Sequence, residues 1–473
     1  SVENETGNTN NNIVHLRGTN VTGTVTGGNK ANGVGNTLIV HSRAGGSTIG
    51  DFSGIQNLHF YVENDAVSAT SPMLRLSGVN AKNITGIGIG VGVNGAAKVL
   101  DVGESIRLLQ TASGSGLTTD AAIQNQITGD HGSSVRYKFD ITKAPGDPTA
   151  LIATVKEKEM KEQTKSYVET RAALADFVNH SGDILAGESL SSAKRAAKSA
   201  QGNAGMESYQ VWAGMGGSAL RAESGSHVDT NGWNLHVGWA RQDPTKSGQT
   251  LFSPFVEYGR GSYDSYVDDN AHTTVHGSGT VSYFGLGLLA RAERKGGLWY
   301  EGSIRGGRAT SDYQSRLDSK VITYDGSNTY YAAHLGLGKD IKVKGEDTVT
   351  PYLRYFYTHQ NGMTATLSGG EVYDFGSVNS HRIRLGFQYT HKVSESNEFY
   401  TGLAYEYEFN GKATATFQGY STPSPSLKGS SGMLELGYRF TPKGQPLTYD
   451  FHFTGWQGIR RGFSGGAQVN WAF

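Results

Sequence analysis

The sequence predicts an all-β protein: a twelve-stranded antiparallel transmembrane β-barrel with an α-helix threading its lumen, preceded by a fragment of a parallel β-solenoid. Three observations predict the barrel. Residues 463–473 alternate, with Ala467, Val469, Trp471 and Phe473 on one face and small or polar residues on the other. Similar segments recur from residue 207 onward, and the connections between them alternate in length. In a transmembrane barrel the apolar face meets lipid, the polar face lines the lumen and aromatic residues mark the interfaces.

Composition sets the class of protein. The 473 residues carry a formal net charge of zero, which gives no indication of a nucleic-acid partner. Cysteine is absent, which excludes a disulfide framework and a cysteine-based metal site. With 66 Gly and 10 Pro, the chain suits a large β structure with many tight turns. The sequence starts at Ser1 without a signal-peptide pattern, so we expect any export signal to lie upstream.

Residues 1–152 are expected to form the solenoid fragment. Short apolar segments such as 11–17, 37–41 and 58–62 are bounded by Gly or Asn, which is typical of short strands joined by turns. Many such strands suit a parallel β-solenoid, although no strict repeat length emerges. A composition boundary near residue 206 separates this half from the next, since all six Trp and 21 of the 24 Tyr follow it.

Residues 153–206 are expected to be helical. Residues 156–165 place Glu and Lys near i,i+4 spacing, and apolar residues then recur at spacings of three, four and seven. A break is expected at residues 181–183, followed by a slim Ala/Ser-rich helix that carries Lys194, Arg195 and Lys198. We expect a slim helix directly before a barrel to lie inside the bore of that barrel. The alternative is a solvated linker helix.

Residues 207–473 are expected to supply the barrel. Twelve alternating segments lie near residues 208–222, 229–241, 250–264, 275–293, 297–312, 328–341, 348–360, 379–391, 397–409, 431–441, 446–456 and 462–473. The connections 243–248, 293–297, 392–397 and 441–445 are short, whereas 263–274, 313–327, 360–380 and 410–430 are long. Short periplasmic turns and long external loops are the asymmetry of outer-membrane barrels, so Phe473 is expected on the periplasmic side. The last strand is expected to pair with the strand near Tyr209.

Four segments resemble the monomeric type V autotransporters of Gram-negative bacteria. Residues 102–110 are similar to the last solenoid rungs of a passenger, and residues 171–187 to the helical linker. Residues 226–233 are similar to the turn into the second barrel strand, and Val469, Trp471 and Phe473 lie in a segment similar to the terminal assembly signal. The resemblance implies an outer-membrane translocator that delivers its own passenger to the cell surface. It also implies outer-membrane lipid, the barrel assembly machinery and periplasmic chaperones as partners, and a monomer.

The resemblance also directs attention to the lumen. Lys194, Arg195 and Lys198 are expected to face acidic residues of the barrel wall, namely Glu257, Glu301, Glu406, Glu408, Glu435 and Asp450. Some family members cut themselves in the helix after an Asn, and Asn179 is the nearest candidate. It lacks the paired Asn-Asn of self-cleaving members, which favours an ordinary helix-surface residue.

Neither a small-molecule enzyme nor a cofactor is predicted. The 14 His are scattered without a zinc-binding spacing, and no phosphate-binding loop is present. Two alternatives to a translocator with a passenger remnant stay open. One is a stand-alone outer-membrane channel or porin. The other is that the solenoid itself is adhesive and binds a host or cell surface, which its polar Gly/Asn-rich composition permits.

Overall fold

The computed structural model describes residues 10–28, 33–63, 67–119, 127–200, 209–271, 273–317 and 319–471, without the side chains of residues 199 and 200. The chain divides into two compact units. The first holds the chain up to Thr164 together with Thr366–Val372 and Phe417–Tyr420, and the second holds the remainder. Within these ranges no helix is both long enough and apolar enough to cross a lipid bilayer.

The first unit is built from two parallel ladders of short strands. One ladder contains β1 (Ile13–Arg17), β3 (Thr37–His41), β5 (Asn57–Val62) and β8 (Gly88–Val93). The other contains β2 (Asn20–Thr26), β4 (Ser47–Ser53), β6 (Leu74–Leu76) and β9 (Ser105–Thr111), and β7 (Ala81–Asn83) pairs with β10 (Gly116–Thr118). Stacked apolar side chains such as Leu38, Leu58 and Phe60 are buried between the ladders.

The rungs of this solenoid differ in length. Ile13 pairs with Thr37, Thr37 with Asn57, and Asn57 with Gly88, which gives steps of 24, 20 and 31 residues. Insertions between the strands account for the differences. The sequence therefore shows no strict repeat even though the strands stack in register.

An antiparallel segment follows the last rung, made of β11 (Ile127–His131), β12 (Val135–Ala144) and β13 (Asp147–Met160). The prediction that residues 156–165 begin a helix is wrong, because β13 continues to Met160. Its charges pair across strands and not along a helix: Lys138 Nζ lies 2.9 Å from Glu157 Oε2. Alternating charges on a two-residue period satisfy the helical i,i+4 template as well, which explains the error.

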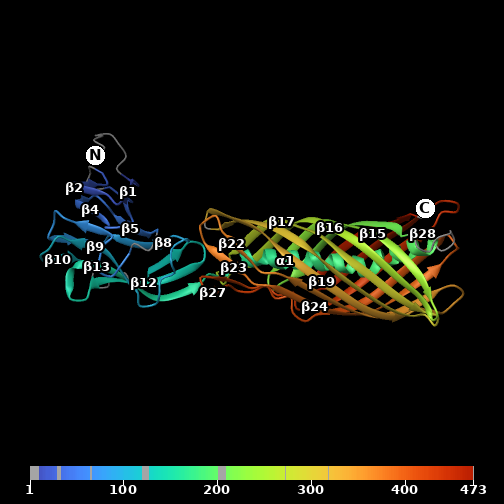
Figure 1. Cartoon of the computed structure of the whole chain (residues 1–473). Helices are drawn as coiled ribbons and strands as arrows, with labels where there is room; N and C mark the ends of the chain where they lie inside the picture. The colour runs from blue at the N-terminus through green and yellow to red at the C-terminus, as the bar shows by residue number, and fades with distance from the viewer. Residues whose placement is uncertain are drawn as a thin grey trace. The chain divides into compact units, whose positions relative to one another are not determined.

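The second unit is a closed barrel (Figure 1). Its twelve described strands are β14 (Gln210–Glu223), β15 (His227–Thr245), β16 (Gly248–Asp268), β17 (Thr274–Arg294), β18 (Leu298–Leu317), β19 (Lys320–Lys339), β21 (Thr348–Gln360), β24 (Val378–Lys392), β25 (Asn397–Glu408), β28 (Gly429–Phe440), β29 (Leu447–Gly458) and β30 (Arg460–Trp471). Each pairs antiparallel with the next, and β30 pairs with β14 from Trp212–Asn470 to Ala222–Arg460. The predicted strand number and closing pair are confirmed. Short strands β20 (Ile341–Lys342), β22 (Met363–Thr366), β23 (Val372–Phe375), β26 (Ala415–Phe417) and β27 (Tyr420–Ser421) lie in the connections.

Two of the connections predicted to be long are mostly strand. β16 extends to Asp268, and β18 and β19 leave a turn at Ser319, where φ is +67°. The inward-facing residues of these extensions, such as Tyr263 and Tyr324, are buried within the unit. Their contacts with the lumen helix stabilise strand structure in segments whose Ser- and Gly-rich composition suggested loops.

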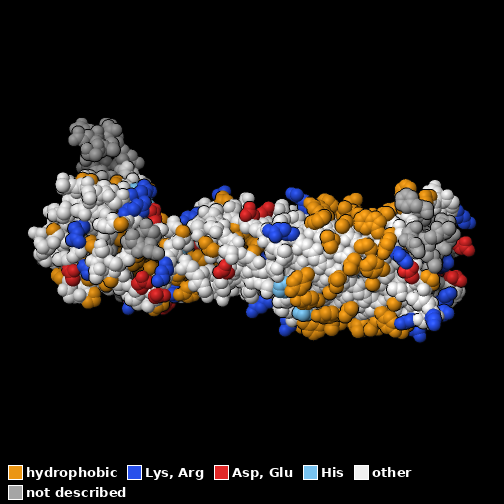
Figure 2. Space-filling model, in the orientation of Figure 1, with side chains coloured by type: hydrophobic (Ala, Val, Ile, Leu, Met, Phe, Trp, Pro, Cys, Tyr) orange, Lys and Arg blue, Asp and Glu red, His pale blue; other side chains and the backbone are white. Residues whose placement is uncertain are grey.

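The outer face of the barrel carries an apolar belt (Figure 2). Phe284, Leu286 and Leu335 are 59 %, 64 % and 65 % exposed, and each alternates with a lumen-facing neighbour. An exposed apolar surface of this extent is expected to contact another apolar phase, here the hydrocarbon of a bilayer. The belt thus confirms which face of each strand meets lipid.

The helical segment lies inside the ring of strands (Figure 1). A short turn η1 (Glu162–Thr164) leads into α1 (Lys165–Ile184), a π-helical turn η2 (Leu185–Ser189) and α2 (Leu190–Ala200). The break predicted at residues 181–183 is wrong, because α1 runs through them and the irregularity falls one turn later, around Gly187. About 36 residues of helix span roughly 54 Å at 1.5 Å per residue, enough to run the length of a bore.

Candidate functional site

The candidate functional site is the interface between the helix and the lumen wall. We call the end of the barrel where β14 starts and β30 finishes the terminal end, and the opposite end the loop end. Every residue of α1 from Ser166 to Ile184 is buried, although the helix contains several charged side chains. Buried charges require partners, so the wall must supply complementary groups along the whole helix.

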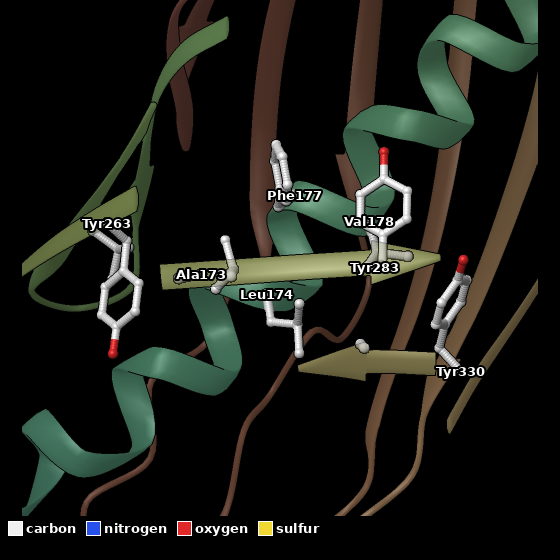
Figure 3. Close-up of a cluster of buried hydrophobic side chains, with 10 residues drawn as sticks. Ala173, Leu174, Phe177, Val178, Tyr263, Tyr283 and Tyr330 are labelled. Carbon is white, nitrogen blue, oxygen red and sulfur yellow. The ribbon is translucent and has the colours of Figure 1, made fainter. Parts of the chain in front are cut away.

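Toward the loop end, one side of α1 packs against tyrosines of the wall, which we call the tyrosine cluster (Figure 3). Ala173, Leu174, Phe177 and Val178 of the helix form a buried cluster with wall residues that include Tyr263, Tyr283 and Tyr330. The Phe177 and Tyr283 rings lie 5.4 Å apart at 64°, a favourable edge-to-face geometry. This cluster covers the side of α1 that faces strands β15 to β19.

Arg171 is anchored near the tyrosine cluster. Its guanidinium donates to Asn328 Oδ1 at 3.0 Å and to the carbonyl oxygens of Asn361 and Gly376 at 2.6 and 2.8 Å. Neutral carbonyl groups thus hold a fully buried cation. The helix is fixed to the loop end by directional contacts as well as by apolar packing.

At mid-helix, three wall arginines converge on one helix carboxylate. Arg382 Nη1 and Arg384 Nη2 lie 2.7 and 2.6 Å from Asp183 Oδ1, and Arg460 Nη1 lies 2.5 Å from Asp183 Oδ2. Arg460 also contacts Asp176 Oδ1 at 2.9 Å. Glu406 of the wall lies 3.0 Å from both Arg382 and Arg384. Such charge-assisted bonds inside a protein are strong and directional.

A second network surrounds Glu257. Arg305 Nη1 lies 2.9 Å from Glu257 Oε1, and the Tyr330 hydroxyl donates to the same oxygen at 2.7 Å. Ser181 of the helix donates to Glu257 Oε2 at 2.7 Å. His236 bridges the π-helical turn, since its ring nitrogens lie 2.9 Å from Ser181 Oγ and 3.2 Å from Ser189 Oγ. The network ties both sides of the π-helical turn to the wall.

Toward the terminal end, the slim second helix packs against one side of the bore. Leu190, Ala193 and Ala196 are buried against Trp212 and Phe255. On the other side a cavity of about 220 Å³ separates the helix from the wall and is lined by charged groups of both. Small side chains on α2 therefore allow close contact on one side, while the other side is polar and open.

The predicted basic residues lie in this half of the bore. Arg195 Nη2 is 3.5 Å from Asp450 Oδ2, a pair that joins two of the predicted groups. Lys194 Nζ is 2.6 Å from Glu293 Oε1, a carboxylate absent from the predicted set. Lys198 is exposed and lines a cavity of about 820 Å³ at the terminal end.

Three of the other predicted acidic residues have partners in the wall, and the fourth lines a cavity. Glu301 lies 2.7 Å from His334 and 3.3 Å from Arg354, and Glu406 lies between Arg382 and Arg384. Glu408 accepts from the Ser380 hydroxyl and from the His381 backbone at 2.8 Å, and Glu435 lines the 220 Å³ cavity. Sequence reasoning missed the reverse pairing, in which helix carboxylates meet wall arginines. The seven-residue spacing of Glu169, Asp176 and Asp183 was the available signal.

Asn179 lies in α1 next to the arginine cluster. Its side-chain nitrogen donates to Ser380 Oγ at 3.0 Å, and Arg382 Nη2 donates to its backbone carbonyl at 3.3 Å. Both contacts fix the residue within a regular helix. In the part of the chain that the structure describes, no group of His, Asp or Glu has the arrangement of a metal site.

The terminal segment closes the barrel through β30. Trp471 faces outward with 45 % of its surface exposed, and Val469 lies opposite Ala213 of β14. Gln468 and Asn470 face the lumen and are buried. Phe473 lies outside the described residues.

One family model and several solved structures match the chain. The family model described as the autotransporter beta-domain matches residues 211–449. The translocator domain of the autotransporter NalP from Neisseria meningitidis is 15% identical, with a TM-score of 0.49, and the match covers 65% of this chain and 99% of that one. The β domain of the Bordetella autotransporter BrkA is 16% identical, with a TM-score of 0.46 and coverage of 56% and 100%. The transport unit of AIDA-I from Escherichia coli is 13% identical, with a TM-score of 0.45 and coverage of 57% and 93%. No curated protein matches the chain.

Proposed function

This chain belongs to the autotransporter family, and from that membership we propose how its parts act. Its barrel is an outer-membrane translocator that delivers and anchors its N-terminal passenger at the bacterial surface. We assign the solenoid unit to the passenger, the helix in the bore to the linker that remains after export, and the twelve strands to the translocator. The helix with its matched buried charges carries this assignment, because it connects passenger and barrel through the lumen.

The terminal strand and the residues that follow it are proposed to be the signal that the barrel assembly machinery and periplasmic chaperones read, with Val469, Trp471 and Phe473 as the residues recognised. Deleting Phe473 is expected to reduce the amount of assembled barrel severalfold, because β30 must reach β14 for closure and aromatic residues anchor strand ends at the interface. The measurement is the heat-modifiable band of an outer-membrane fraction. Deleting Pro423, in the long connection before β28, is the control and should leave that band unchanged. If the two deletions reduced the heat-modifiable band equally, the terminal segment would not be a specific assembly signal.

The helix is proposed to stay intact after export. Cleavage after Asn179 would require its side-chain nitrogen to attack its own backbone carbonyl carbon. That nitrogen donates a hydrogen bond to Ser380 Oγ, and Arg382 of the wall donates one to the carbonyl oxygen. We therefore expect the membrane-embedded chain to keep the mass of the uncut polypeptide in denaturing gels and mass spectrometry. A fragment beginning at His180 would contradict this proposal.

Adhesion is the proposed role of the passenger. The strand β2 is almost entirely exposed and consists of Asn, Thr, Val and Gly, a surface suited to polar contacts with a ligand. Cells that display the chain should then adhere to host cells or other surfaces better than cells that express the barrel alone. If cells that display the chain and cells that express the barrel alone adhered equally, the described rungs of the solenoid would not be adhesive.

A further inference from the structure

The solenoid strand β8 carries glycine along its outer face. Gly88, Gly90 and Gly92 alternate with apolar residues whose side chains are buried in the solenoid. The described pairing of β8 with β11 is the pair Val93–His131, at the end of both strands. A hollow of about 460 Å³ therefore lies over β8, between β5 and β11, and we call it the glycine groove. Its volume is within the usual range of small-molecule sites, about 300–1,000 Å³.

One wall of the glycine groove is aromatic. His59 and Tyr61 of β5 pair in register with Gly90 and Gly92 of β8. A Cβ at Gly90 would lie 2.8 Å from His59 Cδ2. A Cβ at Gly92 would lie 3.3 Å from Tyr61 Cδ2. The two rings thus lean over β8 in space that side chains would otherwise fill. The Tyr61 ring is also fixed at its hydroxyl, to which Asn94 Nδ2 donates at 3.2 Å.

The opposite wall is polar. It consists of Thr128 and Asp130 of β11 and Arg136 of β12. Arg136 Nε lies 3.6 Å from Asp130 Oδ1, and these two side chains are 42 % and 46 % exposed. Lys161 Nζ lies 3.0 Å from Asp130 Oδ2, and Glu159 of β13 pairs in register with Arg136. Two acidic and two basic groups balance each other, so this wall suits a neutral ligand with many hydroxyl groups better than a strongly charged one.

An aromatic wall that faces an exposed carboxylate and guanidinium is suited to a pyranose sugar. The C–H groups on one face of the sugar pack against the negative face of an aromatic ring. Hydroxyls at the edge of the sugar both donate and accept, so they can donate to Asp130 and accept from Arg136. Hydrogen bonds to charged groups are stronger than those between neutral groups. A floor of glycine, in contrast, offers little to distinguish one peptide side chain from another.

We propose that the glycine groove binds a neutral hexose unit of a cell-surface oligosaccharide. The sugar stacks on Tyr61 and forms hydrogen bonds with Asp130 and Arg136. His59 lies two residues from Tyr61, about 6.6 Å along the strand, where its exposed ring contacts the next sugar unit. The inference rests on the proposed adhesive role of the passenger and names the class of ligand.

Sugar binding is measured with the full chain, purified in a detergent without a sugar headgroup, on an array of oligosaccharides that end in glucose, galactose or mannose. We expect binding that the matching free monosaccharide inhibits. Tyr61→Ala and Asp130→Asn should each weaken it at least about tenfold, because the first removes the stacking surface and the second a charged hydrogen-bond acceptor. Tyr61→Phe keeps the ring and should keep the binding.

Lys138→Gln is the matched control. Lys138 lies two residues from Arg136 on the same face of β12, and its ammonium pairs with Glu157 outside the groove. This variant should bind as the parent chain does. Asp130→Asn preserves the size of the side chain, so it decides the outcome if Tyr61→Ala does not fold. The proposal is overturned if no oligosaccharide of the array is bound, or if Asp130→Asn binds as tightly as Lys138→Gln.

Adhesion to host cells separates this inference from the adhesive role itself. Periodate cleaves the carbon–carbon bond between adjacent hydroxyl-bearing carbons and so destroys sugar rings. Cells that display the chain should adhere to untreated host cells and lose most of that adhesion after periodate treatment of the host cells. Undiminished adhesion to treated cells would overturn sugar recognition and leave the adhesive role in place. Binding on the array without adhesion to untreated cells would contradict the adhesive role alone.

Discussion

A barrel without residues 1–200 is expected to conduct ions at least about tenfold better than the full chain, because a twelve-stranded barrel lies between small barrels filled by side chains and porins with open channels. The lumen of this barrel accommodates a helix, whose diameter with side chains is about 10–12 Å. When the helix is present, the tyrosine cluster packs on one side of it and the arginines around Asp183 contact it from strands β24 and β30. Single-channel recording in planar bilayers measures the difference.

The control for this prediction keeps the helix and removes the passenger remnant. A chain that starts at Lys165 should conduct as poorly as the full chain, because the tyrosine cluster around Phe177 and the arginine cluster around Asp183 remain. If the barrel without the helix conducts no better than either, the wall residues collapse into the bore. If the full chain conducts like an open porin, the helix does not stay in the bore when the barrel is in a membrane.

The strands could be predicted from sequence because each obeys a local rule. In β24 the alternation of Arg382 and Arg384 with Ile383 and Leu385 indicates a lumen face and a lipid face without knowledge of any partner. The predictions were wrong where contacts with another element of the fold determine whether a segment is strand or loop. The extensions of β16 and β19 carry Tyr263 and Tyr324, whose inward packing against the helix stabilises strand structure in polar segments.

The pairing of lumen charges could be predicted only in part. The sequence shows that Lys194, Arg195 and Lys198 cluster on the helix, and Arg195 does reach Asp450. It does not show that Arg460, at the start of β30, meets Arg382 and Arg384 of β24 around one helix carboxylate. That meeting depends on barrel closure, on strand stagger and on the depth of the helix, which are global properties of the fold.

Gly437→Ala is expected to destabilise the assembled barrel by about 2–4 kcal/mol, the combined cost of overpacking and of a broken buried hydrogen bond. Gly437 of β28 pairs with Tyr400 of β25, and a Cβ at Gly437 would fall within the Tyr400 ring. The Tyr400 hydroxyl donates to Asp450 Oδ1 at 2.9 Å, and Arg439 stacks 4.1 Å above its ring. Displacing the ring therefore disturbs the groups around Asp450 that also bind the helix.

Gly432→Ala on the same strand is the matched control for Gly437→Ala. A Cβ there would meet only the Gln457 carbonyl oxygen at 3.8 Å, an ordinary contact, and alanine restricts the unfolded chain more than glycine does. The temperature at which the folded band disappears from heat-modifiable gels should fall for Gly437→Ala and stay equal or rise for Gly432→Ala. Because Asp450 binds Arg195 of the helix, Gly437→Ala should also raise the conductance of the full chain, whereas Gly432→Ala should not. A fall in stability without this rise would mean that the tyrosine cluster and the arginine cluster hold the helix without the Arg195–Asp450 contact.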